Sequence, residues 1–487
     1  SSLHVAAAQP LVPAEIERLC DALAQRQTWL RTSGISDWPS GDLGQTYRFR
    51  HELFRKFLYD SLPAARRSRL HQRIGEAVEA AYSGATVEVA AELADDFARS
   101  GDVGRAVNYL REAANVARAR FAHRESLALL DAAFAMLARQ PEGEDRDPWE
   151  FRLQVDRAAA ASSLFGHGSP PARAASERAE ALARRLDASL ERYLGLLVLF
   201  NFRIIRGAVA GATRLAQQME AMAEQLGNPV LTFGSISCLA MADTTRGDLH
   251  AARERFEACV PMLPPEFRLP SFRDVLVPTL TGMAQNYCYL GERELARRAS
   301  DDAIARADWL DDPFERACAR VYEGYCAALF RDRPRAVALA TAGRDIAREY
   351  AIEEMEAIGD IIAAWAARDD DAHIRRRRMV AGIGGLRRTG HLLGFPFYSS
   401  LLAEVELEAG DVESAAAVLA EARAFAEASG DRRHLAEVLR MSALAAERLG
   451  AHPETAAKWV AEARRRARRQ GARLLLARLD DPPLRRG

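Results

Sequence analysis

The fold is decided by a short pattern that recurs along the chain and is clearest in Gly410-Asp411-Val412-Glu413-Ser414-Ala415-Ala416-Ala417-Val418-Leu419-Ala420-Glu421-Ala422. A glycine at a turn is followed by a small residue, then by an apolar residue and another small residue at helical spacing. Offsets of about 4 and 3 place Ala415, Leu419 and Ala422 on one stripe of a helix, where small side chains let a partner helix approach closely. Glycine suits the turn because helices often end in a left-handed residue.

The same pattern recurs at intervals of about 40 residues. The turn positions are Gly207, Gly247, Gly291, Arg331, Gly410 and Gly450. The small residues that follow such turns include Ala106, Ala212, Ala252, Ala296, Ala336 and Ala415. One pair of helices cannot bury such a stripe by itself, so neighbouring pairs must stack. The sequence therefore predicts an all-α fold, a right-handed superhelix of helical hairpins of tetratricopeptide (TPR) type with a period of about 40.

The repeat also predicts where the helix pairs lie. The predicted pairs are 147–187, 188–228, 229–263, 271–312, 313–351, 352–391, 394–431 and 432–472. The apolar stretch from Leu474 to Leu479 is expected to cap the last pair. The pair at 352–391 matches the pattern least well, because His373 to Arg378 carries charge where small residues are expected.

The N-terminal segment does not follow the repeat. Pro13 to Leu30 predicts an amphipathic helix, and Ser33 to Gly44 is rich in turn-forming residues. A short alternating strand, Gln45 to Arg50, then leads into a helix from His51 onward. This order is typical of the latter part of a winged helix. Three regions are thus predicted: a partial winged-helix segment at 1–60, linking and first TPR-like helices at 61–140, and the TPR-like superhelix with its cap at 141–487.

Composition restricts the classes of function. The net charge of −1, from 67 basic and 68 acidic residues, gives no field that would attract nucleic acid or anionic membrane. No apolar run approaches the roughly 20 residues of a membrane span. The six cysteines form no C-x-x-C pair, which fits a reducing cytoplasm. The arginine runs 375–378 and 464–469 are interpreted as solvated helix faces. Neither a membrane nor direct binding of nucleic acid is expected.

Four stretches resemble one known family: 47–59, 69–75, 90–94 and 106–114. They are similar to the region that follows the nucleotide-binding domain in bacterial STAND-type predicted ATPases of MalT-like plan. The resemblance extends over about 1–140 and, less closely, about 394–475. It implies that a winged helix and a TPR-like sensor stand beside an ATPase switch and an output domain. The chain starts at Ser1 without a methionine, and we expect it to be a fragment.

The resemblance implies a non-catalytic sensor and protein-interaction region of a signalling ATPase, and specifically of a transcriptional regulator. A protein partner or small-molecule inducer would bind in the concave groove, and the chain would contact its own upstream domains or self-associate. The sequence contains no G-x-x-x-x-G-K-[ST] loop, so ATP or ADP is expected only with an upstream ATPase domain. Two alternatives remain open at this point: a free-standing TPR scaffold that docks peptides, and the regulatory tail of a nucleotide cyclase.

Candidate site residues follow from the resemblance and from the inner helices. By resemblance, His51 occupies the position of a histidine that senses the nucleotide phosphate in the intact protein, although a helix cap is an equal reading of its position. The residues predicted to line the groove are polar or aromatic: Tyr193, Asn201, Arg203, Asp243, Asn286, Tyr325, Trp365 and Tyr398. Tyr287 is interpreted as a packing residue. The ten histidines show no metal-binding spacing and no catalytic motif is present, so neither a metal site nor an active site is predicted.

Overall fold

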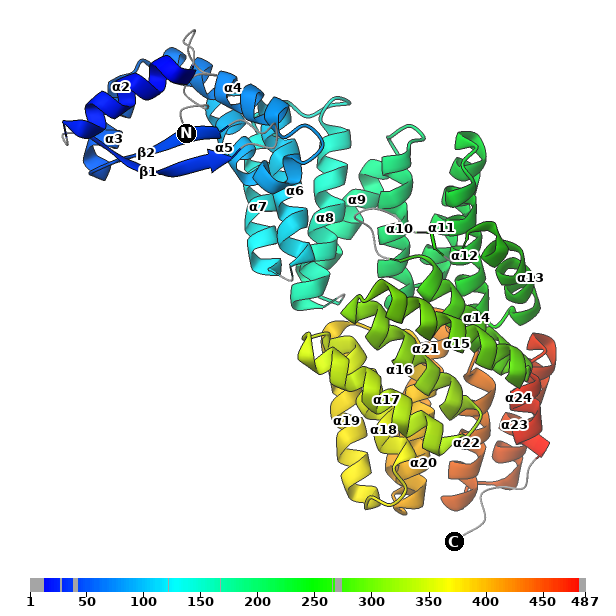
Figure 1. Ribbon diagram of the computed structural model, residues 1–487. Helices are drawn as coiled ribbons and strands as arrows, with labels where there is room; N and C mark the ends of the chain where they lie inside the picture. The colour runs from blue at the N-terminus through cyan, green and yellow to red at the C-terminus, as the bar shows by residue number, and fades with distance from the viewer. Residues whose placement is uncertain are drawn as a thin grey trace. The chain divides into compact units, whose positions relative to one another are not determined.

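The computed structural model describes residues 13–26, 29–37, 43–120, 122–166, 168–264, 266–267 and 274–480. These residues form 23 α-helices and one two-stranded sheet (Figure 1). The chain divides into two compact units, residues 1–164 with 177–186 and residues 165–176 with 187–487. The predicted all-α class is confirmed. No helix in the described part of the chain has the length and apolar character needed to cross a membrane.

The first unit opens with a helix, a hairpin and a second helix. These are α2 (Pro13–Gln25), β1 (Leu30–Asp37), β2 (Leu43–Phe49) and α3 (Glu52–Ser61). The two strands pair antiparallel, with an irregularity between Thr32 and Gly34. The first strand occupies part of a stretch expected to be loop. Pairing with β2 supplies its backbone hydrogen bonds, and Gly34 accommodates the irregularity with a φ of 136°.

The remaining helices of the first unit pack consecutively along the chain. They are α4 (Ala64–Ala81), α5 (Ala90–Ser100), α6 (Val103–Ala119), α7 (His123–Leu137) and α8 (Asp147–Phe165), with a short 3₁₀ turn at Thr86–Val89. The turn between α5 and α6 shows how the sequence sets these boundaries. Gly101 ends α5 in the left-handed region, and Asp102 caps α6 by accepting from the backbone N–H of Arg105 at 3.0 Å. Fully buried Leu93, Phe97 and Leu130 belong to the core of this unit.

The second unit is built of helical hairpins. They are α10 (Leu190–Ile205) with α11 (Val209–Leu226), α12 (Pro229–Arg246) with α13 (Leu249–Cys259), α14 (Leu276–Leu290) with α15 (Arg293–Leu310), α16 (Pro313–Leu329) with α17 (Arg333–Glu349), α18 (Glu353–Ala366) with α19 (Ala372–Thr389), α20 (Phe395–Glu408) with α21 (Val412–Ser429), and α22 (Leu435–Arg448) with α23 (Pro453–Gln470). Each lies where the repeat predicted a pair, including the weak match at 352–391. The predicted pair at 147–187 contains α8 and α9 (Pro170–Ala183), and the predicted cap is α24 (Arg473–Asp480).

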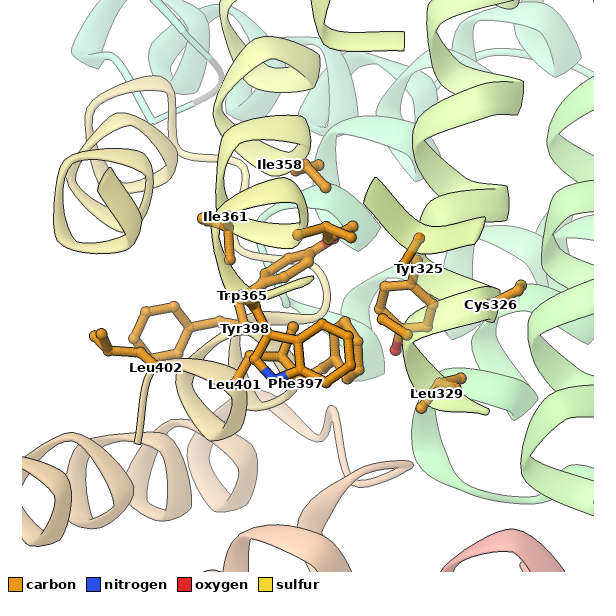
Figure 2. Packing of buried hydrophobic residues seen from close by; sticks show 14 of the residues in the cluster. Tyr325, Cys326, Leu329, Ile358, Ile361, Trp365, Phe397, Tyr398, Leu401 and Leu402 are labelled. Carbon is orange, nitrogen blue, oxygen red and sulfur yellow. The ribbon is translucent and has the colours of Figure 1, made fainter. Parts of the chain in front are cut away.

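The central core of the second unit joins neighbouring hairpins. Tyr325 on α16 lies against Phe397 on α20, with ring centroids 4.0 Å apart, and against Tyr398 at 6.1 Å. Trp365 on α18 is fully buried and belongs to the same cluster (Figure 2). Burial of aromatic rings contributes a large apolar area, so this cluster fixes how three consecutive hairpins stack.

Loops late in the chain also bind the ends of earlier helices in the second unit. The backbone N–H groups of Leu392 and Leu393 both donate to the carbonyl of Ile205 at 2.8 Å. Those of Arg432 and Arg433 donate to the carbonyl of Thr245 at 2.9 and 3.1 Å. Carbonyls in the last turn of a helix have no partner within that helix, so these bonds satisfy them. Hairpins far apart in sequence therefore pack together at the ends of α10 and α12.

Candidate functional site

The structure places most of the predicted groove residues away from solvent. Six of them are at most 2% exposed: Tyr193, Asp243, Asn286, Tyr325, Trp365 and Tyr398. The expectation that these six face an open groove is therefore corrected. The physical cause is helix packing: adjacent helices contact Tyr193, Asp243 and Asn286, and the aromatic core encloses Tyr325, Trp365 and Tyr398. Asn201 is exposed and Arg203 is half-buried, so ligand contact stays a prediction for these two.

Three buried polar residues of that set have protein partners for their side chains: Tyr193, Asp243 and Asn286. The Tyr193 hydroxyl donates to the carbonyl of Leu231 at 2.6 Å, and Asn286 Nδ2 donates to the carbonyl of Leu249 at 3.0 Å. The Asp243 carboxylate accepts from Arg246 and Arg255. Apart from the Asp243–Arg246 pair within α12, these bonds join neighbouring helices, which is a structural role. Tyr287 also behaves as a packing residue, because it is 4% exposed and its hydroxyl donates to Glu257 at 3.0 Å.

His51 caps a helix. It is the N-cap residue of α3, and its Nδ1 accepts from the backbone N–H of Leu53 at 3.3 Å. Its ring meets that of Phe54 edge to face, with centroids 6.1 Å apart. The capping role considered from the sequence is thus seen. Sensing of a nucleotide stays a prediction for the intact protein.

A second histidine of the first unit links three helices. Its Nε2 lies 2.9 Å from the Tyr59 hydroxyl, and its Nδ1 lies 2.7 Å from Asp96 Oδ1. This residue is His71 on α4, between Tyr59 on α3 and Asp96 on α5. Burial raises the pKa of Asp96, and the hydrogen bond from His71 opposes that rise. The chain of bonds fastens α3 to the helices that follow it.

The structure also assembles a group of charged side chains that the sequence did not bring together. They come from the α16–α17 turn, from the start of α17, and from α20, α22 and α24. Glu404 accepts from Arg333 at 2.8 Å and from Arg331, and Glu437 lies 3.1 Å from Arg478. We call this group the arginine clasp; its members are Arg331, Arg333, Arg440, Arg478, Glu404 and Glu437.

Two arginines of the clasp lie over the Trp365 ring, and three of its arginines keep Glu437 ionised. The Arg333 guanidinium lies 4.1 Å from the centroid of the Trp365 ring, and that of Arg331 lies 5.4 Å away. Both are within the range of cation–π attraction. Burial opposes ionisation of Glu437, but Arg440, Arg478 and Arg331 outweigh it and hold the pKa of that carboxyl well below its usual range. A paired charge of this kind is stable inside the protein only while its partners remain.

Arg331 has an unusual backbone for its residue type. Its φ is 61°, whereas the corresponding turns of earlier hairpins use glycine, with φ of 75° at Gly207 and 91° at Gly247. The left-handed region costs a non-glycine residue roughly 1–2 kcal/mol. The sequence showed that arginine takes a glycine slot but not why. In the structure its side chain spans from this turn to Glu404 and Glu437.

A buried histidine joins hairpins on either side of the aromatic core. His434 Nδ1 lies 3.2 Å from the Tyr289 hydroxyl, and its Nε2 lies 3.1 Å from Ser400 Oγ. Burial lowers the pKa of His434 to about 3, so the ring is neutral at physiological pH. The sequence could not reveal this contact, because its members lie on α14, α20 and α22 and no spacing relates them.

One buried carboxyl in the second unit predicts a dependence of stability on pH. Glu406 on α20 is 2% exposed, and the Nε atom of Arg376 is 3.5 Å from it. Burial raises its pKa to about 7. Because the folded state binds this proton more tightly than the unfolded state, the stabilisation is full below about pH 4.5 and is lost as pH rises through 7.

Glu406→Gln is therefore expected to unfold at a higher temperature than the wild type at pH 8, with the difference much smaller at pH 5. Thermal unfolding of both proteins at the two pH values measures this. Equal differences at both pH values would show that the carboxyl does not titrate in this range.

Among the residues that the structure describes, no group of three or more histidine, cysteine, aspartate or glutamate side chains could hold a metal ion. The six cysteines are free thiols. The features that distinguish the described chain are thus its stacked hairpins and the arginine clasp. The stacked hairpins define a TPR-like helical-repeat fold.

Comparison with known sequences gives one relative of low identity. No family model matches the chain. An uncharacterized protein of Rhizobium meliloti (strain 1021) is 24% identical over 449 residues, which are 89% of this chain but 42% of that protein. The chain thus spans less than half the length of this relative.

Two solved structures align with much of this chain. A Rap protein complexed with Competence and Sporulation Factor is 13% identical, covers 80% of this chain and 99% of its own, and gives a TM-score of 0.53. A STAND protein with a tetratricopeptide repeat sensor from Pyrococcus horikoshii is 14% identical, covers 85% of this chain and 68% of its own, and gives a TM-score of 0.41. The first of these likenesses supports the TPR-like fold.

Proposed function

We propose that this chain is the non-catalytic sensor and protein-interaction region of a STAND-type signalling ATPase that regulates transcription in the cytoplasm. The hairpins of the second unit bind a protein partner or inducer. The helix–hairpin–helix module, which we define as residues 13–61, contacts an adjoining ATPase domain that binds ATP or ADP. A ligand with different affinities for two conformations of this region would shift the ATPase switch.

The observation that carries the proposal is the apolar face of α3. This helix has no buried residue, and Leu53, Phe54, Phe57 and Leu58 are between 37 and 70% exposed. The Trp29 ring extends the face, with its centroid 5.3 Å from that of Phe54. Contiguous apolar surface of this kind marks interaction sites in soluble proteins. The resemblance of residues 47–59 to the segment after a nucleotide-binding domain makes that domain the proposed occupant.

The repeats support the sensing part of the proposal. Stacked hairpins leave extended surfaces that such proteins use for binding. The similar Rap structure holds Competence and Sporulation Factor, which is consistent with ligand binding by folds of this kind. Asn201 and Arg203 on α10 remain the candidate contact residues from the original set.

Nucleotide binding tests the proposal. We expect isothermal titration to detect no tight ATP binding to this chain, and tight binding to the longer protein that includes the proposed ATPase domain. Tight ATP binding by this chain alone would contradict the proposal that the adjoining ATPase domain binds the nucleotide. Absence of a G-x-x-x-x-G-K-[ST] motif from the longer gene product would favour the free-standing scaffold instead.

The α3 face gives a matched pair of variants. Phe57→Ser is expected to change the stability of this chain by less than about 0.5 kcal/mol, because Phe57 is 70% exposed. In the longer protein, Phe57→Ser should increase proteolytic cleavage between the module and the ATPase domain. Val87→Ser is the control, because Val87 is 54% exposed and lies in the same unit outside α3. This variant should not increase the cleavage. Equal cleavage in the two variants would argue against α3 as the contact.

A further inference from the structure

The arginine clasp and its immediate neighbours contain more positive than negative charge. Glu408 on α20 accepts from Arg375 at 2.6 Å and from Arg368 at 3.1 Å, and it lies 3.8 Å from Arg333 of the clasp. Even with Arg440 set aside, five guanidinium groups face three carboxylates. The five are Arg331, Arg333, Arg368, Arg375 and Arg478, and the three are Glu404, Glu408 and Glu437.

This surplus lies in a largely buried region. The side chains of Arg333 and Arg478 are 17 and 12% exposed. Burial lowers the pKa of both guanidinium groups, and the neighbouring Arg331 adds to that effect. Charges removed from water are destabilising unless they are fully paired. The surplus of positive charge therefore favours the binding of any anion that can reach the clasp.

Two buried groups at the clasp have hydrogen-bond donors to spare. Arg375 is 4% exposed, and its Nε and Nη1 atoms have no hydrogen-bond partner among the described residues. The same holds for Nε1 of Trp365, which is fully buried. Satisfied donors are the rule in protein interiors, so each exception calls for an explanation.

One member of the clasp is open to solvent. The Arg331 side chain is 34% exposed, so a ligand can reach its guanidinium from the α16–α17 turn. From this turn its side chain reaches both Glu404 and Glu437. Arg331 thus connects the buried surplus of charge to the surface.

We propose that the arginine clasp binds a carboxylate-bearing peptide segment of a partner, with Arg331 as the first guanidinium that it meets. Carboxylate is the matching chemistry, because the clasp already holds Glu404 and Glu437 and the guanidinium fork fits two carboxylate oxygens. An incoming carboxylate adds the negative charge that the clasp lacks. This inference rests on the proposed interaction function and names the chemistry of its partner.

Isothermal titration with hexaglutamate tests the proposal, with hexaglutamine as the uncharged peptide. Arg331→Gly removes the guanidinium while glycine suits the φ of 61°, so the variant is expected to fold. Arg388→Gln is the matched control, at a 70% exposed arginine of the same unit. Wild type and Arg388→Gln should bind hexaglutamate at least about tenfold more tightly than Arg331→Gly, and hexaglutamine should not bind.

Fluorescence localises the site. Hexaglutamate should change the tryptophan emission of the wild type, and Trp365→Phe should remove that change while heat is still released. Equal affinity of wild type and Arg331→Gly for hexaglutamate would overturn the proposal. So would binding of inorganic pyrophosphate that depends on Arg331 without any binding of hexaglutamate. The ATP titration of the longer protein is independent, so a failure here and a failure of the proposed function are distinguishable.

Discussion

Trp365→Ala is expected to lower the free energy of unfolding of the second unit by roughly 3–5 kcal/mol. Trp365 is fully buried in the core cluster of that unit, so its truncation loses apolar burial and leaves a cavity. Arg331 and Arg333 would also lose the ring on which they stack. The expected destabilisation therefore has two parts: the lost packing of the ring and the lost cation–π contacts of the arginine clasp.

Urea unfolding followed by far-UV circular dichroism measures this loss. Trp309→Ala is the control, because Trp309 is 49% exposed, and it should cost less than about 1 kcal/mol. Repeat proteins can unfold in steps, so the transition of the second unit must be followed separately. Similar midpoints for the two variants would mean that Trp365 is not in the core in solution.

Glu437→Gln is the second variant with a large expected effect. It keeps the side-chain volume but removes the negative charge that Arg440 and Arg478 face inside the protein. Removing one partner of a buried ion pair typically costs roughly 3–5 kcal/mol. Glu462→Gln is the control, because Glu462 pairs with Arg466 on α23 and this pair is partly exposed. It should lower the free energy of unfolding by less than about 1 kcal/mol.

The loss at Glu437 has a defined dependence on pH. Its pKa is lowered in the folded protein, so the carboxylate stabilises the fold above about pH 4.5 and ceases to do so as pH falls through the lowered value. Chemical unfolding of wild type and Glu437→Gln at pH 7 should therefore show the full difference. At pH 3 and below the difference should shrink. A difference that grew on acidification would contradict this account of the clasp.

The sequence predicted the hairpins well because their signals are local. A glycine turn and an alanine stripe, as at Gly410 and Ala415, lie within one turn-and-helix segment, and every predicted pair from 188 to 472 contains two helices. The sequence signal for the cap, the apolar stretch from Leu474 to Leu479, is equally local. The β1 strand was only partly foreseen, because its pairing partner rather than its composition makes it a strand.

The burial of the predicted site residues could not be predicted from local sequence signals. Tyr325 and Tyr398 are residue types common at binding surfaces, but their rings pack against each other and against Phe397, between hairpins that are not adjacent in sequence. No periodicity reports such contacts. The same limit applies to Arg375, which was interpreted as part of a solvated face but is 4% exposed and bonded to Glu408.

The central claim is that later hairpins pack on the inner helices of the second unit. Hydrogen exchange at the amides of Leu392, Leu393, Arg432 and Arg433 tests it most directly, since these groups donate to Ile205 and Thr245. We predict that all four exchange slowly, like amides within helices and unlike that of Glu142 in the α7–α8 loop. Exchange of the four amides as fast as that of Glu142 would show that the inner helices are open in solution and would contradict the claim.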